Sequence, residues 1–150
     1  MEETKFIPIH ISHFIQLFKL RNDLQSRKLF NNTRKTNLIK HSLWMLQFKL
    51  RKNQLGFVII NKNNFVGVIY ANVLREKSEA ILSINIDKNY RNKGFGKLSL
   101  KFLIQYLLES NFKHLYAQIL NSNEYSKKLL LNQNFKLYKK DKLFNHYKFE

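Results

Sequence analysis

The feature that most constrains the fold is a glycine turn between an apolar run and an amphipathic run. Residues 80–86 have the composition of a buried strand, and residues 97–109 place apolar side chains at helical spacing. Between them lies the segment Arg91-Asn92-Lys93-Gly94-Phe95-Gly96-Lys97. Two glycines let the backbone approach a ligand closely, and a helix start presents unpaired N–H groups. The junction therefore predicts a strand–turn–helix unit with the chemistry of a pyrophosphate cradle.

The size and composition of the chain limit the classes of protein that it can form. A length of 150 residues, 44% of them hydrophobic, predicts a single domain spanning residues 1–150 with one core. The absence of cysteine excludes disulfides, thiolate metal sites and a cysteine nucleophile, and it fits a reducing cytoplasm. The start of the chain is polar, and no apolar run approaches the roughly 20 residues of a membrane span. We therefore expect a cytoplasmic protein without membrane contact.

The net charge of +17 raises the alternative of a basic nucleic-acid-binding module. Three observations weigh against it. The basic residues are spread over the whole chain, and the abundance of Lys, Asn, Ile and Phe is typical of an AT-rich genome. A positive field also gathers small polyanions. We therefore expect a polyanionic small ligand in preference to nucleic acid.

Residue periodicity predicts alternating helices and strands in one mixed α/β (α+β) domain. The expected strands are 6–9, 56–61, 65–74, 80–86, 115–120, 135–139 and Phe144–Phe149. The expected helices are one capped by Ser12, its continuation over 22–30, Leu38–Leu50, 97–109 and one that starts at Asn121 or Ser122. We expect a polar loop at 31–37, a turn at 75–78, and an inward stripe on the Leu38–Leu50 helix formed by Ile39, Leu43, Leu46 and Leu50.

The glycine turn and a second block downstream resemble the two signatures of the GNAT superfamily of N-acetyltransferases. Arg91-x-x-Gly94-x-Gly96 is similar to the acetyl-coenzyme A loop of that family. The second block, Asn123 through Phe135, resembles Asn-x-x-Ala-x-x-Leu-Tyr followed by Gly-Phe, with Ser126 at the small position. The resemblance implies a mixed, mostly antiparallel central sheet of six to seven strands flanked by about four helices. It also implies that the fourth and fifth strands, 80–86 and 115–120, splay apart around the pantetheine arm.

The same resemblance implies acetyl-coenzyme A as cosubstrate, no metal, and a set of residues that hold the cosubstrate. The phosphate loop would bind through its backbone, and strand 80–86 would polarise the thioester carbonyl through backbone N–H groups. The residues assigned to cosubstrate binding are Ile84, Ile86, Arg91, Asn92, Lys93, Gly94, Phe95, Gly96, Lys97, Asn123 and Ser126.

Two positions of the second block depart from the family pattern. Asn134 replaces a glycine, a substitution that a left-handed helix end tolerates. Leu130 replaces a tyrosine that is often the general acid, and leucine cannot donate a proton. Tyr125 lies roughly 140° around the helix from Leu130, so we expect it to point elsewhere. Water or a hydroxyl from another segment would then assist the leaving thiolate; the alternative is a catalytically weak coenzyme A binder.

Acetyl transfer by direct attack also needs a group that receives the proton of the amine. Strand alternation puts Glu79 and Asn85 on the side of strand 80–86 that faces the cleft, and Glu79 is the conventional base of the two. His41 is the other candidate base. The candidate catalytic residues are thus Glu79, His41 and Asn85. The alternatives are that Glu79 is a solvated edge carboxylate and that His41 only fills the core or the surface.

The N-terminal third resembles bacterial N-acetyltransferases that act on nucleotide-linked amino sugars, such as those of pseudaminic, legionaminic and O-antigen sugar pathways. Arg21-Asn22 followed by His41-x-x-Trp44 carries this resemblance. Arg21, Asn22 and Trp44 are the residue types that bind phosphate oxygens and stack on a base or sugar. The alternative is that these side chains have structural roles.

The expected acceptor is therefore a small-molecule amine on an anionic nucleotide sugar, bound by a monomer or homodimer. A peptide acceptor, as in N-terminal acetylation of ribosomal proteins, is the rival reading. Basic peptides, polyamines and aminoglycosides are cations, which a strongly basic protein repels.

Overall fold

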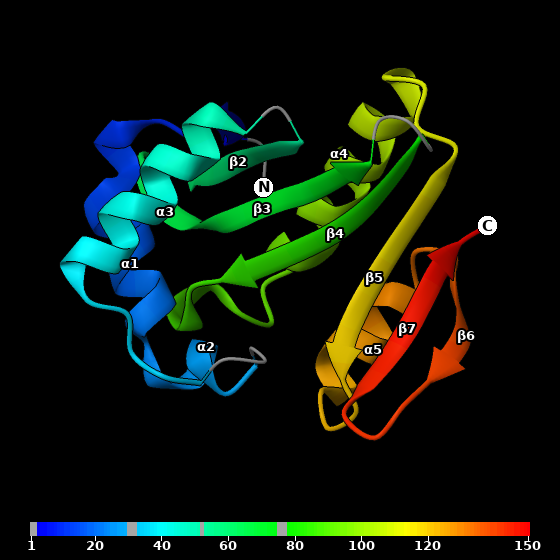
Figure 1. Cartoon of the computed structure of the whole chain (residues 1–150). Helices are drawn as coiled ribbons and strands as arrows, with labels where there is room; N and C mark the ends of the chain where they lie inside the picture. The colour runs from blue at the N-terminus through cyan, green and yellow to red at the C-terminus, as the bar shows by residue number, and fades with distance from the viewer. Residues whose placement is uncertain (1–2, 30–32, 52, 75–77) are drawn as a thin grey trace.

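The computed structural model describes residues 3–29, 33–51, 53–74 and 78–150, and its strands form one seven-stranded sheet (Figure 1). The strand order is β1-β2-β3-β4-β5-β7-β6. The strands are β1 Thr4–Pro8, β2 Gln54–Asn61, β3 Asn64–Leu74, β4 Glu79–Ile86, β5 His114–Leu120, β6 Phe135–Lys140 and β7 Phe144–Phe149. The α-helices of the described residues are α1 Phe14–Asn22, α2 Leu24–Arg27, α3 Leu38–Leu50, α4 Phe95–Glu109 and α5 Glu124–Leu131. The expected element order and a mixed sheet of six to seven strands are confirmed.

The sheet is split along part of the β4–β5 boundary. These two strands are parallel, and their pairing is limited to Glu79–Leu82 of β4 with His114–Ala117 of β5. β4 remains paired with β3 along its whole length, and β5 remains paired with β7 as far as Leu120. Among the described residues, no strand pairs with the second half of β4 on its β5 side, and the two halves of the sheet diverge as a V (Figure 1). The splay predicted for these two strands is confirmed.

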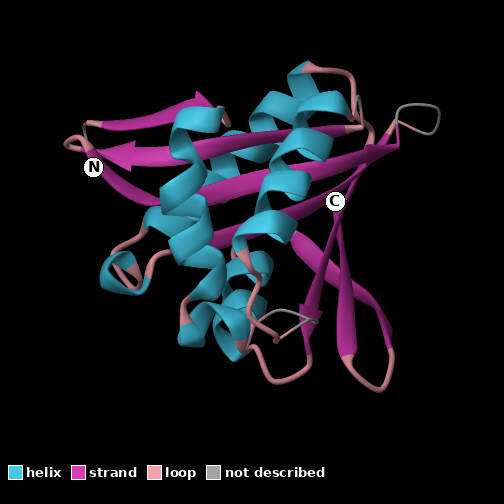
Figure 2. Ribbon diagram, turned by 60° about the vertical axis from the view of Figure 1, so that its left-hand side comes forward, coloured by secondary structure: helices cyan, strands magenta, loops and turns pink. Residues whose placement is uncertain are grey.

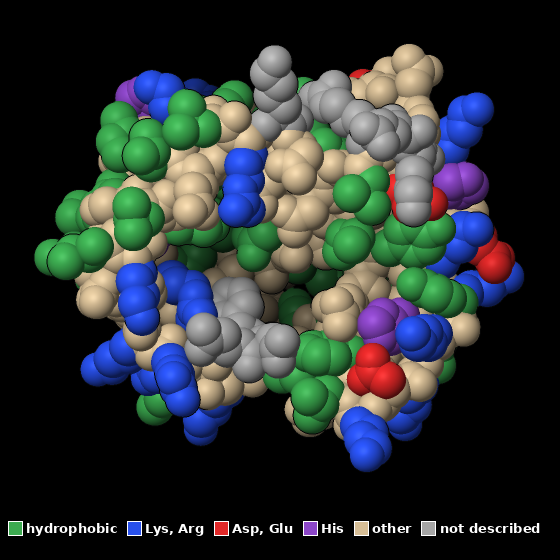
Figure 3. Space-filling view, viewed as in Figure 1, with side chains coloured by type: hydrophobic (Ala, Val, Ile, Leu, Met, Phe, Trp, Pro, Cys, Tyr) green, Lys and Arg blue, Asp and Glu red, His purple; other side chains and the backbone are tan. Residues whose placement is uncertain are grey.

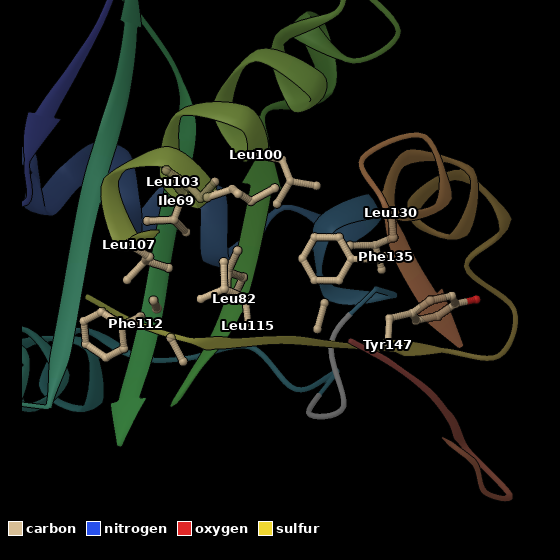
Figure 4. Close-up of a cluster of buried hydrophobic side chains, with 14 of the residues drawn as sticks. Ile69, Leu82, Leu100, Leu103, Leu107, Phe112, Leu115, Leu130, Phe135 and Tyr147 are labelled. Carbon is tan, nitrogen blue, oxygen red and sulfur yellow. The ribbon is translucent and has the colours of Figure 1, made fainter. Parts of the chain in front are cut away.

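Helices pack on both faces of the sheet (Figures 1 and 2). α4 and α5 pack on one face, called here the inner face, where Leu103 and Leu107 of α4 meet Ala80 and Leu82 of β4 in the main core (Figure 4). α1 and α3 cover β2 and β3 on the opposite, outer face. Because side chains alternate along a strand, the inward Ala80 and Leu82 put Glu79, Ile81 and Ser83 on the outer face.

The chain enters its first helices differently from the prediction. Ser12 does not cap the helix; His10 caps a 3₁₀ turn over Ile11–His13, and α1 begins at Phe14. The continuous helix expected over 22–30 breaks at Asp23, whose ψ is 132°. The Asp23 carboxylate accepts the Ser26 N–H at 2.8 Å and so starts the separate helix α2. A short acidic side chain favours this local bond over a continued helix.

The start of α5 was also misplaced. The sequence predicts a start at Asn121 or Ser122, because Asn121-x-x-Glu124 has the spacing of a capping box, but α5 begins at Glu124 with Asn123 as its N-cap. The Asn123 carboxamide accepts the Ser126 N–H at 3.1 Å. Part of the loop expected at 31–37 and of the turn expected at 75–78 lies outside the described residues.

The predicted inward stripe of α3 is wrong. Ile39 is 72% exposed and Leu50 is 69% exposed, and Leu43 and Leu46 are also exposed. His41 and Met45 are buried instead, and Trp44 packs beside them against β2 and β3. α3 carries apolar side chains on more than one face, so their spacing in the sequence alone could not identify the face that packs against the sheet. The aromatic stripe fills the space above β2 and β3, and the aliphatic stripe faces solvent.

Candidate active site

In the described part of the chain, the open half of β4 has backbone groups on its β5 side that no strand pairs. The Asp87 N–H donates to Val66 O of β3 at 2.8 Å, so it points away from β5. The N–H and C=O of one residue point to the same edge of a strand, and those of the next residue point to the other edge, so the N–H and C=O groups of Ile84 and Ile86 point toward β5. In agreement, Ile86 O accepts the Arg91 Nε–H at 3.0 Å from that side. The opening therefore offers backbone donors and acceptors to a molecule placed between the strands.

The glycine turn forms the start of α4 without any side-chain cap. Asn92 and Gly94 have φ values of 59° and 83°, a left-handed conformation that glycine and asparagine adopt most readily. The first intrahelical bond runs from Leu98 N to Gly94 O. The amides of residues 95–97 precede this bond, so they lack intrahelical partners and carry the positive end of the helix dipole. This arrangement suits a phosphate group.

Gly96 keeps space open between α4 and α5. A Cβ atom at Gly96 would lie 3.4 Å from Leu129 Cδ2 and 3.8 Å from the Tyr125 hydroxyl. A larger side chain would fill a cavity of about 280 Å³ beside the turn, called here the loop cavity. Its lining residues come from β4, the turn and α5 with its N-cap: Ile84, Asn85, Ile86, Tyr90, Arg91, Asn92, Gly96, Asn123, Tyr125, Ser126 and Leu129, with Leu29 from the turn after α2.

A second cavity of about 130 Å³ continues from the loop cavity into the split of the sheet, and is called here the passage. The two cavities share residues of β4 and α5, including Ile84, Asn85 and Ser126. Tyr70 and Ser83 line the passage, as do buried core residues such as Leu100 and Leu130. The outer face is visibly hollowed at this position (Figure 3).

A third depression of about 330 Å³ lies near the paired ends of β4 and β5 and is called here the outer groove. It shares Ala117 and Gln118 with the passage, so the two adjoin where β5 leaves β4. The groove lining is aromatic and ionisable. It consists of Leu74, Glu79, Ile81, Tyr116, Ala117, Gln118, Tyr138 and His146.

Most residues predicted to bind the cosubstrate gather around the loop cavity. Ile84, Ile86, Asn92, Gly96, Asn123 and Ser126 all line it, as does Asn85, which was predicted to be catalytic. Three others do not present side chains to it. Phe95 is buried against the ring of Tyr90 at 5.9 Å, Lys93 lies over the same ring, and Lys97 is exposed. These three residues can contact a ligand bound at the turn through their backbone groups, and the two lysines can attract it through their charges.

Arg91 lines the loop cavity but also ties the turn to α2. Its guanidinium donates to Ile86 O at 3.0 Å, to Ser26 Oγ at 2.9 Å and to Gln25 Oε1 at 3.3 Å. Lys88 adds an ion pair with Asp23 at 3.7 Å. The side chain of Arg91 therefore holds α2 against the end of β4, a role that the sequence motif did not indicate.

The structure does not bring His41 and Trp44 to the described cavities. His41 is only 4% exposed, and its Nε2 lies 3.2 Å from Phe14 O among the rings of Phe14, Phe18 and Trp44. Burial lowers the pKa of His41, and the contact with Phe14 O only partly offsets this. Both side chains fill the core between α1, α3 and the sheet.

Arg21 and Asn22 are separated by the structure. Asn22 closes the loop before α3: its Nδ2 donates to Thr36 O at 3.0 Å and its Oδ1 accepts the Thr36 N–H at 2.8 Å. Arg21 instead lies near the phenol of Tyr70, a residue of the passage. Burial raises the pKa of Tyr70, while a hydrogen bond with Ser83 and the charge of Arg21 act against this rise.

Glu79 lies at the paired end of β4, opposite His114, and it lines the outer groove. The structure therefore separates it from the loop cavity, where Asn85 lies.

Sequence reasoning missed four site residues: Tyr70, Gln118, Tyr125 and His146. Tyr125 lines the loop cavity and Leu130 lines the passage, so Tyr125 points elsewhere than Leu130, as predicted, although it still lies beside the cleft. Tyr70 could have been found from its place opposite Ser83 in the β3–β4 hairpin. His146 carries no local signal, since its position depends on the register of the last three strands.

The described residues contain no group of three or more His, Cys, Asp or Glu side chains placed to hold a metal ion. Within the same residues, no helix has the length and hydropathy needed to span a membrane.

Comparison with known proteins agrees with the geometry. The sequence model of the acetyltransferase (GNAT) family matches residues 17–135. None of the curated proteins matches the sequence significantly. Many solved structures match the fold.

Three of the similar structures are named as N-acetyltransferases, and two of these names state an acceptor. RimL, a ribosomal L7/L12 α-N-protein acetyltransferase in complex with coenzyme A, has a TM-score of 0.87 at 16% identity, with 99% of this chain and 94% of that chain covered. PseH, a Campylobacter jejuni N-acetyltransferase in complex with acetyl coenzyme A, has a TM-score of 0.77 at 20% identity, with 98% of each chain covered. A Vibrio cholerae spermidine N-acetyltransferase with coenzyme A and spermine has a TM-score of 0.86 at 11% identity, with 99% and 94% covered. At these identities the likeness concerns the fold.

Proposed function

The chain belongs to the acetyltransferase (GNAT) family and is an acetyl-coenzyme A-dependent N-acetyltransferase, and from this premise we propose that its acceptor is the primary amine of a nucleotide-linked amino sugar. The observation that carries this choice is the polarity of the outer face around the opening. Lys and Arg are the charged side chains seen on the α1–α2 side of the hollow, whereas on the β5–β7 side Lys and Arg are mixed with acidic side chains and histidine (Figure 3). Glu79 and His146 line the outer groove on the other side.

The residues of the opening fit the cosubstrate. The uncapped amides of residues 95–97, with the Asn92 and Gly94 backbone, suit the pyrophosphate. The peptide groups of Ile84 and Ile86 suit the amides of the pantetheine arm and the thioester carbonyl. Bound acetyl-coenzyme A supplies the activated acetyl group, and the amine attacks it directly because the chain has no cysteine for an acyl-enzyme.

The proton donor at the passage must differ from that of the family pattern. Leu130 is 5% exposed and belongs to the hydrophobic core, so it supplies no proton. We assign the role to the hydroxyl of Tyr70, which lies in the passage and is hydrogen-bonded with Ser83. Burial raises the pKa of Tyr70, so the hydroxyl stays protonated and able to donate near neutral pH.

The two charged groups of a nucleotide-linked amino sugar, its diphosphate and its amine, both have partners of opposite charge on the outer face. Its diphosphate is the natural partner of guanidinium groups such as Arg21, which bind phosphate oxygens in pairs. Its amine is a cation, which suits the groove that contains Glu79. A polyamine would match the groove but not the basic side, and the net charge of +17 opposes its approach.

Release of free thiol from acetyl-coenzyme A, followed with UDP-glucosamine, spermidine and an N-terminal peptide as parallel acceptors, tests the proposal. The expected result is turnover with the nucleotide sugar and a KM at least tenfold lower than that of spermidine. Preferential turnover of the peptide or of spermidine would contradict the acceptor class. Thermal stabilisation by RNA without stabilisation by coenzyme A would instead favour a nucleic-acid-binding module.

A further inference from the structure

The turn between β6 and β7 holds one histidine of the outer groove in a fixed position. His146 Nε2 lies 2.8 Å from Asp141 Oδ2, and the His146 side chain is 18% exposed. The other carboxylate oxygen of Asp141 accepts the N–H groups of Leu143 and Phe144 at 2.9 and 2.8 Å. Asn121, at the end of β5, donates to Asp141 O at 3.0 Å. The carboxylate that contacts the imidazole is thus fixed from several sides.

His146 lies one strand away from the point where the sheet splits. It is the direct register partner of Gln118 on β5. Gln118 lines both the outer groove and the passage, while the β4–β5 pairing ends one residue earlier at Ala117. Because residues directly opposite in adjacent strands share a face of the sheet, His146 lies on the same face as Gln118.

A β-bulge places an aromatic ring beside this histidine. The β6–β7 register shifts between Leu137 and Lys139, which leaves Tyr138 unpaired. The Tyr138 ring lies 6.2 Å from the His146 ring and 5.8 Å from the Tyr116 ring. Bulges often redirect a side chain next to a functional site. The groove therefore combines an oriented imidazole, a carboxylate from Glu79 and two phenol rings.

We propose that His146 is the base that takes the proton from the acceptor ammonium in the outer groove, and that Asp141 is its positioning residue. With Nε2–H donating to Asp141, His146 Nδ1 carries the lone pair. The N–H bond of the ammonium breaks, its electron pair stays on the amine nitrogen, and the proton binds to Nδ1. The inference rests on the proposed function of the opening as an acetyl-transfer site.

Other ionisable groups around His146 can also contribute to a pH profile of the reaction. They are Asp141 from the turn, Tyr138 and Lys139 from β6, Tyr116 from β5 and Glu79 from β4. Glu79 is the rival base in the same groove, so the test compares variants of both residues.

The experiment measures kcat of His146→Gln from pH 6 to 9.5 at saturating acetyl-coenzyme A, with UDP-glucosamine and spermidine as probes. At pH 7, kcat should fall about a hundredfold, as for loss of a general base. Without the base, the variant reacts only with amine that is already deprotonated. This fraction of the amine rises about tenfold per pH unit up to the pKa of the amine, so the loss of kcat should shrink by the same factor. Asp141→Asn should cost about tenfold, since a misoriented ring still accepts protons. The matched control His10→Gln, on an exposed residue of the N-terminal 3₁₀ turn, should match the wild type.

The opposite kinetic results for an active wild-type protein overturn the proposal. A His146→Gln profile equal to that of the wild type, or a loss that is constant with pH, rules out the base role, and a Glu79→Gln variant with the pH-dependent loss transfers it to Glu79. If neither probe is acetylated by the wild-type protein, the failure concerns the proposed function. The imidazole C–H resonance of His146, assigned by its absence in His146→Gln, then decides: no shift on adding either amine overturns the proposal.

Discussion

The two sides of the opening between β4 and β5 are built from different parts of the chain. On the side of the turn, the groups that we propose to bind the cosubstrate are peptide amides from one continuous segment, residues 92–97, and from the end of β4. On the outer face, the groups are side chains: Arg21 from α1, Tyr70 from β3, Glu79 from β4 and His146 from β7. The comparison indicates that the donor side depends on backbone conformation and the acceptor side on individual side chains.

The largest effect is expected from a substitution that disturbs the backbone of the glycine turn. Gly94→Val places a β-branched residue at φ 83°, a conformation that costs roughly 1–3 kcal/mol for such residues and misaligns the amides of the turn. We expect the apparent KM for acetyl-coenzyme A to rise by about a hundredfold, with the acceptor KM little changed. Steady-state kinetics with each substrate varied in turn measures both values.

Gly94→Asn is the matched control, because asparagine tolerates the left-handed conformation and should keep most of the affinity. A valine variant whose cosubstrate affinity equals that of the wild type would remove the assignment of the turn as the pyrophosphate site.

The next effect concerns a single side chain of the acceptor side. Arg21→Ala removes a guanidinium whose charge-assisted hydrogen bonds are worth about 1.5–3 kcal/mol each. We expect the acceptor KM to rise about tenfold or more, with the KM for acetyl-coenzyme A unchanged. Lys19→Ala, an exposed neighbour on α1, serves as the control and should leave both KM values unchanged. A change confined to the cosubstrate KM would reverse the assignment of the two sides.

The same difference explains what the sequence could and could not predict. The turn was predictable because its glycines, its preceding strand and its following helix are consecutive, so local conformational rules apply to all of it. The outer groove was not, because Glu79 and His146 are brought together by the order of strands β4, β5 and β7. The bulge at Tyr138 adds a register shift that no spacing in the sequence marks.

The α1–α3 region shows a second limit of sequence reasoning. His41 and Trp44 were selected because their chemistry suits an anionic sugar, yet they pack with Phe14 in the core. The choice of buried stripe on α3 depends on the shape of the surface above β2 and β3, which periodicity does not contain. An aromatic residue type therefore could not be assigned to a site or to the core before the packing was known.

A smaller effect should appear where the two sides are joined. Arg91→Lys keeps the charge but loses most of the fork that reaches Ile86 O, Ser26 Oγ and Gln25. Because Ser26 is fully buried, the loss should cost about 1–3 kcal/mol, or a fall of roughly 2–10 °C in Tm. Lys97→Ala, at an exposed position of the same segment, should change Tm little. Equal Tm values for the two variants would show that the link between α2 and the turn does not contribute to stability.

The smallest effect concerns the turn that holds His146. The hydrogen bond with His146, followed by those from the Leu143 and Phe144 amides, lowers the pKa of Asp141 from 3.8 to about 2. A carboxylate with a lowered pKa in the folded state stabilises the protein above its unfolded pKa, and this contribution is lost as the pH falls from about 4 to 2. Thermal unfolding of the wild type and of Asp141→Asn should therefore differ slightly at pH 5 and converge near pH 2. Asp87→Asn is the control variant, because it removes the carboxylate that caps a turn elsewhere in the chain, the 3₁₀ turn Lys88–Tyr90. A Tm difference for Asp141→Asn that persists unchanged at pH 2 would show that the carboxylate charge does not hold the turn, and it would weaken the case for an oriented imidazole at the groove.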